Sequence, residues 1–170
     1  MRGAKGRNFE EVINTFFAES RERLDDMEAS LLELEKNSSD EESLNSVFRA
    51  AHTIKGSAGM FGFDDIGNFA HAVENLLGDI RSKKLKYDSG IGALLLECHD
   101  FLLKIVNFFD ENRQAKIDKQ MLEEAVLLRD KMGRYQKRKE HPVAGGGAAG
   151  KEAEEEAHRL AGITVDNTGA

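Results

Sequence analysis

Apolar side chains recur at steps of three, four and seven residues along most of this sequence, and that spacing constrains the fold more than any other feature. The period matches one face of an α-helix, and no alternating pattern typical of a β-strand competes with it. Helices joined by short loops pack as antiparallel neighbours, so the predicted fold class is all-α, an up-and-down antiparallel helical bundle. We expect helices over residues of about 8–34, 39–58, 64–80, 88–112 and 118–138.

A four-helix core with a fifth helix packed beside it is the expected arrangement. We predict that the second to fifth helices form most of this core. The alternative places the first helix in the core and the fifth outside it. The sequence does not choose between them, because an apolar stripe shows which face of a helix is buried and not which helix covers it.

Two helix starts and one helix end carry local signals. Ser39 followed by Glu42 has the spacing of a capping box for the second helix. Asp64 and Asp65 are expected to supply an N-cap and favourable negative charge for the third helix. Between these helices, the glycine-containing stretch 59–63 predicts a short connection.

The sequence predicts one domain over residues 8–138 and a different kind of segment after it. Residues 139–170 begin with a Gly-rich linker and continue into an acidic tail that is too short to build a core, so we expect disorder there. Cys98 is the single cysteine and lies among apolar residues, which excludes an internal disulfide and favours a small buried side chain.

Composition narrows the class of partner. The net charge of −7 disfavours nucleic-acid binding, which needs clustered Lys and Arg. No apolar run reaches the roughly 18 residues of a membrane span, and no signal-peptide pattern follows the basic start, so we expect a cytoplasmic protein without a membrane span. No long heptad seam is present, and we expect a monomer.

The chemically informative stretch is 50–62, which reads AAHTIKGSAGMFG. His52, Lys55 and Gly56 share one helix face, with Gly59 about one turn further along. Each glycine inside a helix costs about 1 kcal/mol relative to alanine, so these two predict a close approach. The approaching group is either another molecule at His52 or a neighbouring helix, and the glycines alone do not decide between the two.

A second group lies on the third helix, where His71 and Glu74 are one turn apart. If the second and third helices are antiparallel neighbours, a carboxylate from one reaches the imidazole of the other. A carboxylate that accepts the Nδ1–H of His52 would fix its tautomer and leave Nε2 as the nucleophile. Lys55 would then place a positive charge near the oxygens of a phosphoryl group.

Plainer interpretations compete with this one. A histidine at a helix edge is commonly a surface residue, and His71 with Glu74 is also the spacing of an ordinary surface pair. A metal site built from His52, His71 and Glu74 lacks an H-E-x-x-H pattern, and we expect no bound metal. Neither a G-x-S-x-G turn nor a phosphate-binding P-loop occurs.

Residues 50–63, with the core H-x-x-K-G-S, resemble the phosphorylation-site helix of the histidine phosphotransfer (HPt) domain in CheA-type chemotaxis histidine kinases. The resemblance continues upstream through 44–49 and downstream through 69–77, and covers roughly 9–135. It implies a five-helix HPt fold. It also implies that this chain is a phosphoryl carrier in two-component signalling and not an enzyme on its own.

The resemblance also assigns roles. It implies that His52 accepts a phosphoryl group from ATP, which a separate kinase catalytic domain binds, and passes it to an aspartate in a response regulator receiver domain of the CheY or CheB type. It implies that Glu74 orients His52, that Lys55 and His71 assist, and that Gly56 and Gly59 allow partners to dock. No cofactor is expected on this chain, and the parent protein is expected to be an ATP-dependent histidine kinase.

Overall fold

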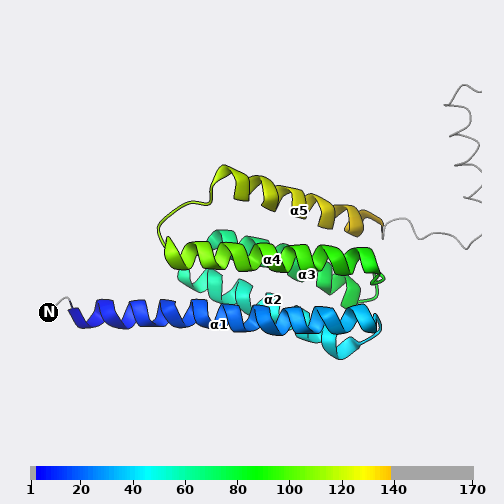
Figure 1. Cartoon of the computed structure of the whole chain (residues 1–170), viewed down its shortest axis with the longest axis horizontal. Coiled ribbons are helices and arrows are strands. Elements are labelled where there is room, and N and C mark those ends of the chain that lie inside the picture. The colour runs from blue at the N-terminus through cyan, green and yellow to red at the C-terminus, as the bar shows by residue number, and fades with distance from the viewer. Residues whose placement is uncertain (1–2, 139–170) are drawn as a thin grey trace, which may run out of the picture. The chain divides into compact units, whose positions relative to one another are not determined.

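Five helices follow one another along the described part of the chain (Figure 1). This computed structural model describes residues 3–138, with side chains from residue 8 onward. No strand occurs within 3–138, so the predicted all-α class is confirmed. The linker and tail predicted for 139–170 lie outside the described residues. The helices are α1 (Gly3–Lys36), α2 (Glu41–Phe61), α3 (Asp64–Arg81), α4 (Ser89–Glu111) and α5 (Lys119–Arg138).

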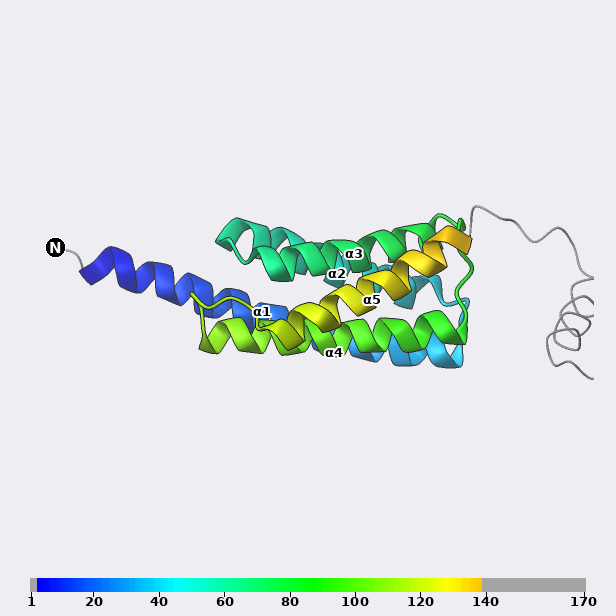
Figure 2. The ribbon, with the colours of Figure 1, turned by 90° about the horizontal axis from the view of Figure 1, so that it is seen from above.

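The four-helix core consists of α1, α2, α3 and α4. Helix α1 packs against α2 and α4, and α3 closes the ring by packing against the same two helices. Among the described helices, α5 contacts only α3 and α4, and it crosses over them from outside (Figure 2). The prediction that the second to fifth helices form the core is therefore wrong, and the alternative with the first helix inside is confirmed.

The apolar content of the two helices explains this choice. Helix α5 contributes a short stripe of four buried residues: Met121, Ala125, Leu128 and Met132. Helix α1 contributes a longer stripe of large side chains: Ile13, Phe16, Phe17, Leu24, Met27, Leu31 and Leu34. A helix with the longer and bulkier stripe buries more apolar area when neighbours cover it on two sides.

Aspartates cap several helix starts. The carboxylate of Asp40 accepts hydrogen bonds from the backbone N–H groups of Glu42 and Ser43 at 3.1 and 3.3 Å. The predicted capping box at Ser39 is therefore wrong by one residue, because the Asp40 carboxylate binds two of the free N–H groups at the start of α2. Asp88 caps α4 in the same way, through a 2.8 Å bond from the N–H of Ile91.

The turn between α2 and α3 differs in detail from its prediction. Helix α2 continues to Phe61 and ends at Gly62, which has φ +77°. The N–H groups of Gly62 and Phe63 bond back to the last turn of the helix, which is a Schellman ending. Phe63 occupies the N-cap of α3 without a side-chain bond, so Asp64 and Asp65 contribute charge in the first turn and no cap.

Two residues of α4 lie in the core. Cys98 is fully buried, as predicted, and burial raises the pKa of its thiol to about 12, so it is not a nucleophile at neutral pH. His99 is also buried, and its Nε2 lies 3.1 Å from the backbone oxygen of Leu24. A carbonyl only accepts, so Nε2 donates, and this bond ties α4 to α1.

Adjacent leucines on α1 test whether this helix belongs to the core. Leu31 is fully buried, whereas Leu32 is 43% exposed. We expect Leu31→Ala to lower the free energy of unfolding by about 2–5 kcal/mol, because it leaves a cavity in the core. Leu32→Ala should cost less than about 1 kcal/mol. Urea unfolding followed by circular dichroism measures both, and equal losses would place α1 outside the core.

Candidate functional site

Helices α2 and α3 run antiparallel from the tight turn at Gly62 and approach each other closely at Gly67. A Cβ built on Gly67 would lie 3.7 Å from the Cβ of Ala58, at ordinary contact distance. This packing brings the middle of α2, with His52 and Lys55, opposite Glu74 on α3. The proximity of His52 and Glu74 that the sequence predicted is therefore present.

The imidazole of His52 makes one hydrogen bond in the described part of the chain. Its Nδ1 lies 3.0 Å from Oε2 of Glu74. An ionised carboxylate only accepts, so Nδ1 carries the proton and Nε2 keeps a free lone pair. The side chain of His52 is 62% exposed, whereas that of Glu74 is 13% exposed. A nucleophilic nitrogen thus lies at the surface, held from beneath by a largely buried carboxylate.

Glu74 remains ionised because Lys55 and His52 both bind its carboxylate. Burial is the largest single influence and raises the pKa of Glu74, but the hydrogen bonds and electrostatic attraction from Lys55 and His52 together lower it below its usual value. The folded-state pKa is therefore lower than that of the unfolded chain. The resulting stabilisation is present above the usual glutamate pKa and is lost as the pH falls through the folded-state pKa.

Lys55 and His71, the other polar residues predicted for the site, differ in what they contact. The Nζ of Lys55 lies 2.9 and 2.8 Å from the two carboxylate oxygens of Glu74, so its ammonium group binds that carboxylate. His71 is exposed one turn before Glu74 and lines a hollow of about 190 Å³ with Lys55 and Gly59. Within residues 8–138 no three His, Cys, Asp or Glu side chains gather as metal ligands would.

The space beside Gly56 and Gly59, where a side chain would extend, is open. A Cβ built on either residue would meet nothing within 4 Å among the described residues. Packing between helices therefore explains neither glycine. Of the two explanations that the sequence left open, an approach by another molecule is the one that remains for the cost of two glycines in α2.

Three contacts of the site were not predicted from the sequence. The ring of Phe48 lies nearly parallel to that of His52, with centroids 6.1 Å apart and planes inclined by 14°. The guanidinium of Arg81 lies 4.1 Å from the centroid of Phe48, and its Nε donates a 2.7 Å hydrogen bond to Asn45. The spacing of Phe48, one turn before His52, was a usable signal, whereas the position of Arg81 depends on how α2 and α3 pack.

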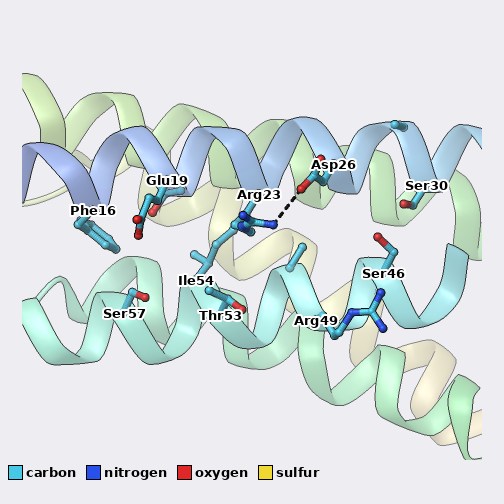
Figure 3. A pocket seen from close by; sticks show the side chains of 13 residues that line it. Phe16, Glu19, Arg23, Asp26, Ser30, Ser46, Arg49, Thr53, Ile54 and Ser57 are labelled. Carbon is cyan, nitrogen blue, oxygen red and sulfur yellow. Dashed lines mark hydrogen bonds and ion pairs between the residues drawn. The ribbon is translucent and has the colours of Figure 1, made fainter. Parts of the chain in front are cut away.

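On its other side, α2 borders an open groove of about 710 Å³ between α1 and α2. Figure 3 shows Thr53 and Ser57 of α2 opposite Glu19 and Arg23 of α1, with Arg23 bonded to Asp26. The two sides of α2 therefore differ: polar bonds join α2 to α3, whereas an open groove lies between α2 and α1.

A protein-family model for the Hpt domain matches residues 11–107. This match includes the helices that position His52 and Glu74. The chain belongs to the Hpt domain family. The resemblance drawn from residues 50–63 is thereby confirmed.

Relatives of this Hpt domain are much longer proteins. The chemotaxis protein CheA of Rhizobium meliloti is 37% identical over 117 residues, which cover 65% of this chain and 15% of that protein. The chemotaxis protein CheA of Salmonella typhimurium is 39% identical over 104 residues, which cover 61% of this chain and 16% of that protein. The chain thus spans about 15% of the length of these relatives.

Solved structures share the fold. The phosphorylated P1 domain of CheA3 in complex with CheY6 from R. sphaeroides matches with a TM-score of 0.67 and 28% identity, over 74% of this chain and 98% of that one. The CheA phosphotransferase domain from Thermotoga maritima matches with a TM-score of 0.55 and 35% identity, over 58% and 94%. These matches confirm the HPt type of the bundle.

The carboxyl titration of Glu74 tests the electrostatics of the site. We expect its pKa to lie below the usual glutamate value in the wild type and to rise in Lys55→Met, because burial then acts against fewer compensating bonds. Carboxyl ¹³C chemical shifts followed against pH measure this change. Lys104→Met, which removes the partner of the exposed Glu124, is the matched control and should leave Glu74 unchanged. An unchanged pKa in Lys55→Met would contradict the assignment.

Proposed function

We propose that this Hpt domain is the phosphoryl carrier of a CheA-type histidine kinase. His52 accepts a phosphoryl group from ATP and passes it to an aspartate of a response regulator. The observation that carries the proposal is the bond between Nδ1 of His52 and Glu74, because it leaves Nε2 exposed with its lone pair free. Family membership supports the same reaction class.

The first step is an attack of Nε2 on the γ-phosphorus of ATP. The lone pair of Nε2 forms the P–N bond, the bond to the bridging oxygen breaks, and ADP leaves with that electron pair. The ring becomes positively charged because Nδ1 retains its proton. Glu74 stabilises this charge in the way a buried aspartate stabilises the imidazolium of a catalytic triad.

The second step returns the domain to its starting state. A carboxylate oxygen of the regulator's aspartate attacks the phosphorus, the P–N bond breaks, and its electron pair returns to Nε2. The ring is again neutral, with the proton still on Nδ1 beside Glu74. Both steps occur at the same exposed nitrogen, so one site serves donor and acceptor in turn. The nearby ammonium of Lys55 balances the carboxylate, and His71 is one turn away on α3.

Partners dock over the exposed side of α2. Gly56 follows His52 by one turn and Gly59 lies a further turn along, both with open space above them. A flat helix surface lets the backbone of a partner approach Nε2 closely. One solved relative is described as a P1 domain in complex with CheY6, and this supports a receiver domain as one partner of our chain. The other partner is a kinase catalytic domain that binds ATP.

The parent protein is a longer ATP-dependent histidine kinase, as the length of the relatives suggests. ATP is bound by its catalytic domain, and the Hpt domain itself holds no cofactor. An ATP-dependent relay of this kind operates in the cytoplasm. None of the helices in the described range is long and apolar enough to cross a membrane.

Phosphorylation by a CheA-type catalytic core with ATP tests the carrier role. We expect the wild type to gain one acid-labile phosphoryl group and His52→Gln to gain none, because the variant lacks the nucleophilic nitrogen. His71→Gln should still be labelled, which separates the acceptor from its exposed neighbour. Intact-protein mass spectrometry at neutral pH counts the groups. Label that persists in His52→Gln, or an unlabelled wild type with its cognate core, would leave a structural adaptor as the better account.

Gly56→Leu tests the docking surface. A Cβ at Gly56 meets no described atom within 4 Å, and replacing glycine within a helix should stabilise the fold by about 0.5–1 kcal/mol. Phosphotransfer should nevertheless become slower by at least roughly tenfold, because the added side chain obstructs the approach to Nε2 at a cost of order 1.4 kcal/mol. Urea unfolding and transfer kinetics measure the two effects. A stabilised variant with an unchanged transfer rate would place partner docking elsewhere.

A further inference from the structure

The bond to Glu74 does not by itself fix the orientation of the His52 ring. One hydrogen bond at Nδ1 sets a distance, but a side chain that is 62% exposed has room to rotate about that contact. Phosphoryl transfer needs the lone pair of Nε2 to point along the line of attack, so misorientation of the ring reduces the rate. A second contact that restricts the ring plane would therefore matter for the reaction.

Phe48 provides such a contact. It lies one turn before His52 on α2, and the two rings are nearly parallel, with 14° between their planes and 6.1 Å between their centroids. This separation is within the range of offset-stacked aromatic pairs. Rotation of the imidazole out of its plane would bring it against the ring of Phe48 or separate the pair. Phe48 thus restricts the rotation that the bond to Glu74 leaves open.

Phe48 is itself held by α3. The guanidinium of Arg81 lies 4.1 Å from the centroid of the Phe48 ring, a cation–π contact. The Nε of Arg81 also donates a 2.7 Å hydrogen bond to Asn45, which belongs to α2. At Gly78 a Cβ would lie 3.9 Å from the edge of the Phe48 ring, so the backbone of α3 borders the ring there.

We propose that Phe48 and Arg81 are positioning residues for His52, in which Arg81 holds the ring of Phe48 and Phe48 holds the plane of the imidazole. Neither residue touches the phosphoryl group in this scheme. The effect on rate rests on the proposed function, whereas the orientation of the ring can be measured without it.

Phe48 substitutions provide the first test. Phe48→Leu removes the flat contact, and we expect phosphorylation of His52 to slow by roughly 2- to 10-fold, the factor that corresponds to an aromatic pair. NOEs between the imidazole protons of His52 and α3 should change from those of one ring orientation to an average over several. Phe48→Tyr keeps the ring and should restore both the rate and the spectrum. Phe108→Leu, a partly buried phenylalanine on α4, is the matched control.

Substitutions at Arg81 distinguish the contribution of its planar guanidinium from that of its positive charge. Arg81→Lys keeps the positive charge but not the planar guanidinium, and Arg81→Met removes both. We expect the two variants to slow phosphorylation similarly and to loosen the ring orientation of His52 to a similar extent. Arg113→Lys is the matched control, because Arg113 lies over the ring of Phe17 at 5.8 Å. Thermal unfolding shows whether each variant remains folded.

The outcomes decide between this proposal and its rivals. A wild-type rate and spectrum in Phe48→Leu would overturn the role of Phe48. An Arg81→Lys that behaves as wild type while Arg81→Met does not would show that charge acts, and would overturn the role of the planar contact. If even the wild type fails to be labelled, the proposed function fails, and the NOEs of His52 in the same variants still decide the positioning role.

Discussion

The largely buried carboxylate of Glu74 is the constraint on which the site depends. A lone carboxylate at this depth would have a raised pKa, because burial favours its neutral form. Lys55 and His52 prevent this by binding its two oxygens from α2. The same bonds join α2 to α3, fix the tautomer of His52 and leave Nε2 at the surface. Electrostatics, helix pairing and reactivity therefore depend on one group.

Two histidines bond to a neighbouring helix, and their surroundings determine what each can do. His99 is buried, and its Nε2 bonds the backbone of α1, so it contributes to packing. His52 bonds through Nδ1 and exposes Nε2, so its second nitrogen is free to react. His52 has one nitrogen bonded and the other exposed, whereas His99 is buried. This difference distinguishes a reactive histidine from a structural one here.

One side of α2 is held by contacts with α3, and its other sides are accessible. Toward α3 it is held by the Glu74 bonds, by close packing at Gly67 and by the stack of Arg81 on Phe48. Toward solvent it presents two glycines at which a Cβ would meet no described atom within 4 Å, and toward α1 it borders an open groove. Under the proposed function, this division keeps the nucleophile firmly held while a partner approaches it.

Much of this was determined by the sequence. The 3.6-residue period specified the helices, and the one-turn spacing of His52 and Lys55 placed both on one face. An antiparallel third helix was expected to bring Glu74 to them. The choice of α1 over α5 for the core, the cap at Asp40 and the stack of Arg81 on Phe48 were decided only by the tertiary structure. Periodicity describes each helix separately, whereas these features depend on which helices meet and how their ends are oriented.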